Sequence, residues 1–75
     1  MPEKTLHSAT GSMAISLILK EADLTKTTSE ARRMLQQGAV RLDGERITDI
    51  GLELAAGASC VIQVGKRRVA RITIA

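Results

Sequence analysis

The sequence predicts a small α+β domain, with two short helices in its first half and β-hairpins in its second. Three observations predict this class: apolar residues at helical spacing, a capped helix that stops at Gly38, and two strand-forming stretches with turn signals. The chain has 75 residues, too few for more than one domain. We expect that domain to span residues 11–75.

The first part of the chain predicts a lead-in followed by a helix. Residues 1–10 show no clear period and contain the only proline, so we expect a disordered lead-in or linker there. A helix is expected over 11–23, with Ser12 as a plausible N-cap. Its apolar stripe consists of Ala14, Leu17, Ile18 and Ala22, widened by Ile15 and Leu19.

The stretch from Thr27 to Gly38 predicts the second helix. Thr27 and Glu30 have the spacing of a capping box, and Gly38 can supply the left-handed residue that ends the helix. The apolar stripe is Ala31, Met34 and Leu35. The other faces carry Arg32, Arg33, Gln36 and Gln37. These polar residues form either an ordinary solvated surface or a surface that binds a polyanion.

Residues 39–48 predict a β-hairpin, because Asp43-Gly44 is the sequence that a two-residue type I′ turn requires. This register places Val40 opposite Ile47 on the core side and Arg41 opposite Arg46 on the other side. Like charges in direct cross-strand positions are destabilising. Either a phosphate lies near the two arginines, or both side chains extend into water.

The last third of the chain predicts turns and a second hairpin. Residues 48–59 have no clear period and suggest turns, perhaps with one helical turn. Residues 60–64 and 69–74 are β-rich apolar runs, separated by a turn with the basic tip Lys66-Arg67-Arg68. Cys60 lies in an apolar run and is expected to be a small buried hydrophobic residue.

Composition narrows the possible functions. The net charge is +3, and no acidic residue follows Glu53, which suggests an anionic partner such as nucleic acid. The chain has no Phe, Tyr or Trp, so it lacks platforms for base stacking. His7 is the only histidine, and we find no nucleophile–base pair, Cys/His metal pattern or Gly-rich phosphate loop. We therefore expect no catalytic residue, metal or cofactor in this chain.

The same features bear on the compartment. Met13–Leu19 is apolar but far too short to span a bilayer, so no membrane association is expected. A single cysteine cannot form an internal disulfide, which fits a reducing, cytoplasmic compartment.

Two motifs resemble a known family. Thr27-Thr28-Ser29-Glu30-Ala31-Arg32-Arg33-Met34-Leu35-Gln36-Gln37-Gly38-Ala39-Val40-Arg41-Leu42-Asp43-Gly44 resembles the RNA-binding module named after the fourth protein of the small ribosomal subunit, the S-four domain. Ile62-Gln63-Val64-Gly65-Lys66-Arg67-Arg68 resembles the C-terminal copy in bacterial-type tyrosyl-tRNA synthetases. The resemblance covers about residues 15–74. It implies an α+β fold with two short helices packed on a small, strongly bent, antiparallel-rich sheet.

The resemblance also implies which residues contact RNA. Glu30 is given a capping or orienting role, and Arg46 is included as the partner of Arg41. Thr28 stands where the family usually has a basic residue, and Lys26 is the nearest substitute. Val69 stands where the synthetases usually carry an aromatic residue. The candidate contacts are Lys26, Thr28, Ser29, Arg32, Arg33, Gln36, Gln37, Arg41, Arg46, Lys66, Arg67 and Arg68.

Three functional interpretations follow. The preferred one is the C-terminal appendage of a tyrosyl-tRNA synthetase, which grips tyrosine tRNA near its long variable arm and anticodon stem. The domain alone would be a monomer without activity, and the parent ligase a homodimer. A second is the same module in a pseudouridine synthase or a ribosome-associated stress protein that binds ribosomal RNA. A third, of a different class, is a protein-interaction module that uses an exposed sheet edge or helix.

Overall fold

The computed structural model describes residues 2–75, so Met1 of the expected lead-in lies outside the described residues. The described part is a mixed α+β domain, as the sequence predicts. Its elements are β1 (Glu3–Leu6), β2 (Ser12–Ala14), α1 (Ile15–Glu21), α2 (Thr28–Gln36), β3 (Val40–Leu42), β4 (Glu45–Ile47), β5 (Glu53–Ala55), β6 (Ser59–Val64) and β7 (Arg68–Ile74).

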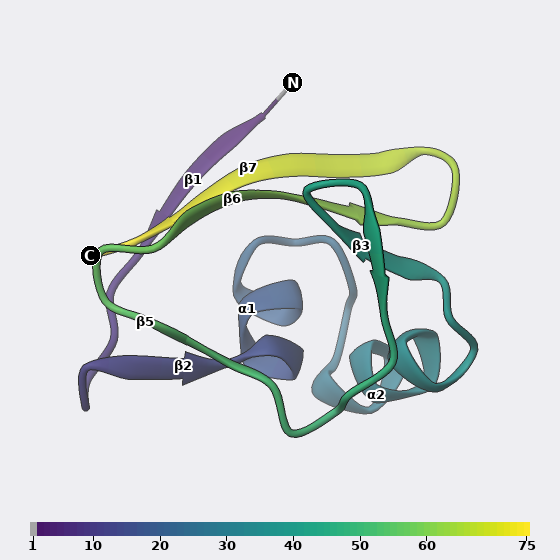
Figure 1. Ribbon diagram of the computed structural model, residues 1–75, viewed down its shortest axis with the longest axis horizontal. Helices are drawn as coiled ribbons and strands as arrows, with labels where there is room; N and C mark the ends of the chain where they lie inside the picture. The colour runs from purple at the N-terminus through teal and green to yellow at the C-terminus, as the bar shows by residue number, and fades with distance from the viewer. Residues whose placement is uncertain (1) are drawn as a thin grey trace.

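A five-stranded sheet covers the two helices from one side (Figure 1). Its strand order is β1-β7-β6-β3-β4, and every neighbouring pair is antiparallel except β1 and β7, which are parallel. In Figure 1, β3 runs across the direction of β6 and β7, as in a bent sheet. A separate two-stranded ribbon, β2 with β5, lies on the far side of α1 from β6 and β7.

The core lies between the large sheet and the helices. Alternate residues of β6 and β7 point inward, and both helices contribute one apolar side. The largest fully buried side chains are Ile15, Ile18, Leu19, Leu35, Val40, Ile62, Val64, Ile72 and Ile74. Branched aliphatic residues therefore fill the interior of a chain that has no aromatic residue.

The limits of α2 confirm the prediction for the second helix. The Thr27 hydroxyl accepts a hydrogen bond from the Glu30 N–H at 3.0 Å. At the other end, Gly38 has φ +70° and its N–H donates to the Leu35 carbonyl. The Ala39 N–H donates to the Met34 carbonyl, which completes a Schellman motif.

The first hairpin has the predicted turn and register. Asp43 and Gly44 both have positive φ, at 51° and 88°, as a type I′ turn requires. Val40 pairs with Ile47, and Arg41 pairs with Arg46. The second hairpin, β6 with β7, is also confirmed, and its register pairs Val64 with Arg68.

The expected helix over 11–23 is wrong at its start. Ser12–Ala14 form β2, and the helix begins at Ile15 after Ala14, which makes no side-chain cap. The Ser12 hydroxyl donates to the Glu53 carboxylate at 2.8 Å and so caps no helix. Pairing of Met13 with Leu54, 41 residues away, buries both side chains at least partly and outweighs the local helical pattern.

The predicted apolar stripe of this helix is also partly wrong. Leu17 is 37% exposed, whereas Ser16, outside the predicted stripe, is buried. Ile15, Ile18 and Leu19 are fully buried, as expected for the more buried helix.

The expectation of a disordered lead-in is wrong for residues 3–6. They form β1, the parallel edge strand beside β7, in which Glu3 pairs with Arg71 and Leu6 with Ile74. In residues 48–59 the expected turns are present at 50–51 and 56–57, but Glu53–Ala55 form β5 and no helical turn is present. Both strands form by pairing with distant segments, so their own residues carry little signal.

Candidate nucleic-acid interface

The outward face of α2 carries the polar side chains that the sequence singles out. Ser29, Arg33 and Gln36 follow at helical spacing on the side away from the buried Ala31 and Leu35. Ser29, Arg32, Arg33, Gln36, Gln37 and the preceding Lys26 are exposed, and Thr28 is half-buried. The helix therefore presents cations and amides to solvent along its length.

The lysines and arginines of the chain divide into those that form ion pairs among the described residues and those that do not. Of the 11 Lys and Arg residues, four form ion pairs within the described part of the chain: Lys4, Lys20, Arg68 and Arg71. The other seven have no carboxylate within 4.0 Å among residues 2–75. These seven, which we call the unpaired cations, are Lys26, Arg32, Arg33, Arg41, Arg46, Lys66 and Arg67.

Glu30 is the acidic residue of α2, and its carboxylate is held at the start of the helix. Its Oε1 accepts a hydrogen bond from the Lys26 N–H at 2.9 Å and lies 3.4 Å from Nη1 of Arg68. The Lys26 hydrogen bond and the charge of Arg68 lower the pKa of the Glu30 carboxyl from its usual value. Glu30 therefore has the capping and orienting geometry expected of it.

The two arginines of the first hairpin are direct cross-strand partners, but they have different surroundings. Arg41 alternates with the buried Val40, lies on the outer face of the sheet and pairs with Gln63 of β6. The Arg46 side chain instead lies over Gly38, where a Cβ would be 3.1 Å from the Arg46 Cδ. Arg46 is therefore close to the C-terminal end of α2, where the helix dipole favours a cation.

The basic tip of the second hairpin divides into two parts. Lys66 and Arg67 lie in the turn and are exposed. Arg68 opens β7, and its Nη1 donates to the Leu24 carbonyl at 2.9 Å. This contact brings the tip beside the N-terminus of α2, although about 40 residues of chain separate them.

The candidate residues thus gather around α2, with one exception. Lys26 and the basic tip lie near the start of the helix, and Arg46 lies near its end. Arg41 lies on the outer face of the sheet, beside Gln63 of β6. The alternation from Cys60 to Val64 places Gln63 on the same outer face.

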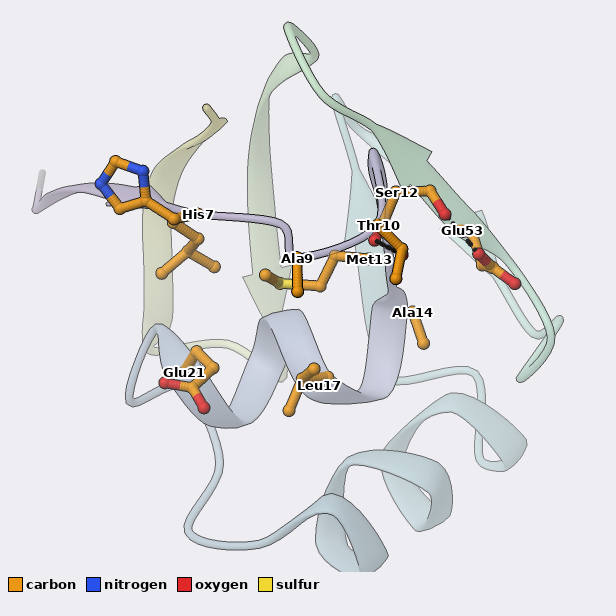
Figure 2. Close-up of a pocket in the computed structure, with 10 residues that line it drawn as sticks. His7, Ala9, Thr10, Ser12, Met13, Ala14, Leu17, Glu21 and Glu53 are labelled. Carbon is orange, nitrogen blue, oxygen red and sulfur yellow. Dashed lines mark hydrogen bonds between the residues drawn. The ribbon is translucent and has the colours of Figure 1, made fainter.

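A shallow cleft adjoins the basic tip. It has a volume of about 380 Å³, and its charged lining consists of three cations, Lys4, Arg67 and Arg68, and one acid, Asp23. A larger cavity, of about 540 Å³, lies between α1 and the connection from β1 to β2 (Figure 2). Glu21 and Glu53 line that cavity and no lysine or arginine does, so it does not suit a polyanion.

Other kinds of site find little support. Among residues 2–75, no three His, Cys, Asp or Glu side chains are placed to hold a metal ion. Neither described helix is long and apolar enough to cross a membrane. Cys60 is free and buried, as predicted. The pKa of its thiol is raised, mainly by burial and to a smaller extent by the negative charge of Asp43. A raised thiol pKa disfavours the reactive thiolate.

Comparison with known proteins matches this chain to one family of domains and to one kind of ligase. The family model described as "S4 domain" matches residues 16–59, more than half of the chain. The chain is 50% identical over 74 residues to a protein of Thiobacillus denitrificans named tyrosine–tRNA ligase, covering 99% of this chain and 19% of that protein. It is 52% identical over 75 residues to the tyrosine–tRNA ligase of Geobacter sulfurreducens, covering 100% of this chain and 19% of the relative.

The chain therefore spans about a fifth of the length of these curated relatives. Among solved structures, it resembles the 30S ribosomal protein S4e of Thermoplasma acidophilum, with a TM-score of 0.54 and 24% identity. That alignment covers 72% of this chain and 28% of the ribosomal protein. At this identity the likeness concerns the fold alone.

Proposed function

This chain belongs to the S4 domain family, and we propose that it binds structured RNA through the surface around α2. The unpaired cations are the observation that carries the proposal. Lysines and arginines without carboxylate partners are free to replace the counterions of phosphates, whereas ion-paired ones must first lose a partner. The exposed amides and hydroxyls of α2 add hydrogen-bond donors for phosphate and sugar oxygens.

The residue composition of the chain favours recognition of RNA by its shape and its phosphate backbone. The chain has no aromatic ring on which a base could stack, and no cofactor is needed for electrostatic binding. If about five groups contact phosphates, log affinity should fall with log salt at a slope of roughly −4. Candidate contacts are Lys26, Thr28, Ser29, Arg32, Arg33, Gln36, Gln37, Arg41, Arg46, Lys66 and Arg67.

We further propose that the RNA is tyrosine tRNA and that the domain works within a cytoplasmic tyrosine–tRNA ligase. The 50% and 52% identities to such ligases, over nearly the whole chain, support this step. The aminoacylation chemistry would belong to the rest of that ligase, expected to be a homodimer. Tethering would turn a modest affinity into a useful grip, because it raises the effective concentration of the domain near bound tRNA.

A titration against two RNAs tests both steps. One RNA is tyrosine tRNA, and the other is the same tRNA with its long variable arm shortened. Tighter binding to the intact tRNA, weakened steeply by salt, is the expected result. Equal, salt-sensitive binding to both would contradict the tRNA assignment and indicate a general RNA-binding module, as in a ribosomal RNA-binding protein. Binding to neither at low salt would contradict the RNA-binding function and favour a protein partner.

A further inference from the structure

Arg68 differs from the other cations of the basic tip because its guanidinium is already engaged. Nη1 donates to the Leu24 carbonyl at 2.9 Å and lies 3.4 Å from the Glu30 Oε1. Its neighbours Lys66 and Arg67 form no ion pair within residues 2–75. One arginine of β7 therefore touches both the connection between the helices and the first turn of α2.

These contacts belong to a continuous set of hydrogen bonds at the start of α2. The Glu30 Oε1 that faces Arg68 also accepts from the Lys26 N–H at 2.9 Å. The Thr27 hydroxyl accepts from the Glu30 N–H at 3.0 Å, and the Thr25 hydroxyl donates to the Thr27 carbonyl at 3.0 Å. Arg68 thus connects the sheet to a segment in which each polar group orients the next.

The position of this segment matters for the proposed RNA surface. The segment runs from the Leu24 carbonyl to the Glu30 side chain, residues 24–30, and it contains Lys26, Thr28 and Ser29. The other ion pair that ties it to the sheet, between Lys4 and Asp23, spans 3.6 Å, and the Asp23 side chain is 85% exposed. An exposed pair of this kind contributes little. The Arg68–Glu30 pair is itself partly exposed, at 47% and 32% of the two side chains. Arg68 adds a hydrogen bond of 2.9 Å to the Leu24 carbonyl, and so makes the stronger connection to the sheet.

Arg68 also balances the negative charge of α2. The Glu30 carboxylate lies at the start of the helix, where an approaching phosphate would be repelled by it. With the Arg68 guanidinium beside it, the pair is close to neutral, and the unpaired cations determine the local potential. Loss of Arg68 would both loosen the segment and leave the carboxylate uncompensated.

We infer that Arg68 is a positioning residue of the RNA interface, acting through Glu30 and Leu24, and is not itself a phosphate contact. This inference rests on the proposed RNA-binding function. It differs from the expectation that Lys66, Arg67 and Arg68 all contact RNA, and it assigns direct contact within the tip to Lys66 and Arg67 alone.

The test compares Arg68→Gln with Arg67→Gln, which removes the same charge from the adjacent exposed position. Affinity for a tyrosine tRNA transcript is measured at several salt concentrations. Hydrogen exchange of the Lys26 amide is measured in the free protein, with a thermal unfolding curve for each variant. A phosphate contact and a positioning residue differ in these readouts, because only the contact changes the number of released counterions.

For Arg68→Gln we expect affinity to fall about three- to tenfold with an unchanged salt slope, and the Lys26 amide to exchange faster. For Arg67→Gln we expect a slope shallower by about 0.9 and unchanged exchange at Lys26. In a Glu30→Gln background, Arg68→Gln should have a smaller effect on affinity, because one of its two partners has lost its charge.

A shallower slope for Arg68→Gln with unchanged Lys26 exchange would overturn the inference, as would unchanged affinity. If Arg68→Gln does not fold, Arg68→Lys replaces it: the charge stays, the fork of donors is lost, and faster Lys26 exchange with weaker binding is expected. Unchanged binding and exchange in Arg68→Lys would overturn the inference. Absence of RNA binding by the unmodified chain would defeat the proposed function, and this inference with it.

Discussion

The side chain of Arg46 covers Gly38 at the point where α2 gives way to β3, so that a Cβ on the glycine would lie 3.1 Å from the Arg46 Cδ. Gly38 has φ +70°, which an L side chain adopts only with strain. The contact also places Arg46, the direct cross-strand partner of Arg41, at the end of the helix, where the dipole favours a cation.

Gly38→Ala should therefore lower the free energy of unfolding by about 1–2 kcal/mol, mainly through left-handed strain. The Arg46 side chain is flexible and can move aside, so the penalty should be nearly the same in an Arg46→Ala background. Urea unfolding of the four proteins of this double-mutant cycle checks the result. A penalty that disappears with Arg46→Ala would show that steric contact is the main cost.

Arg33→Ala should weaken binding to tyrosine tRNA by about 1–3 kcal/mol, because Arg33 is an exposed, unpaired cation at the centre of the α2 face. The salt slope should become shallower by about 0.9. Lys20→Gln is the matched control, since Lys20 lies on α1 and is paired with Glu21 at 3.8 Å. Equal losses in both variants would mean that binding follows net charge and not this surface.

Glu30 makes the stability of the domain depend on pH in the acidic range. Its pKa is lowered in the folded state by the Lys26 N–H and by Arg68, so the carboxylate stabilises the fold above its unfolded pKa. This contribution is lost as the pH falls through the folded pKa, below the usual range of a glutamate. Melting temperatures measured from about pH 7 to about pH 3 should fall less for Glu30→Gln than for the unmodified chain. Parallel curves for the two proteins would contradict the assigned role.

Asp43 joins the first hairpin to β6, since its carboxylate accepts the Val61 N–H at 2.9 Å and its own N–H donates to the Val61 carbonyl. Asp43→Ala removes this acceptor and places an alanine at φ 51°, so we expect a loss of about 2–3 kcal/mol. Asp43→Asn keeps an oxygen acceptor and a residue that tolerates this conformation, and should cost under about 1 kcal/mol. Denaturant titration distinguishes them, and an equal loss in both variants would show that the carboxylate charge is essential.

Local sequence patterns specified the elements that depend on neighbouring residues. Thr27, Glu30 and Gly38 define both ends of α2, and Asp43-Gly44 defines the first hairpin and pairs Arg41 with Arg46. The resemblance carried by these motifs led to the family that comparison confirms. Caps and tight turns act over three or four residues, so their signals can be read along the chain.

Elements that depend on distant partners were set by packing in three dimensions. Pairing with Glu53–Ala55 made Ser12–Ala14 a strand instead of the start of a helix, and pairing with β7 ordered residues 3–6. The fold also separated Arg68 from Lys66 and Arg67, three adjacent cations that look equivalent in sequence. Pairing between strands that are distant in sequence, and the partners of a long side chain, are set by what packing brings near, and a local pattern does not reveal that choice.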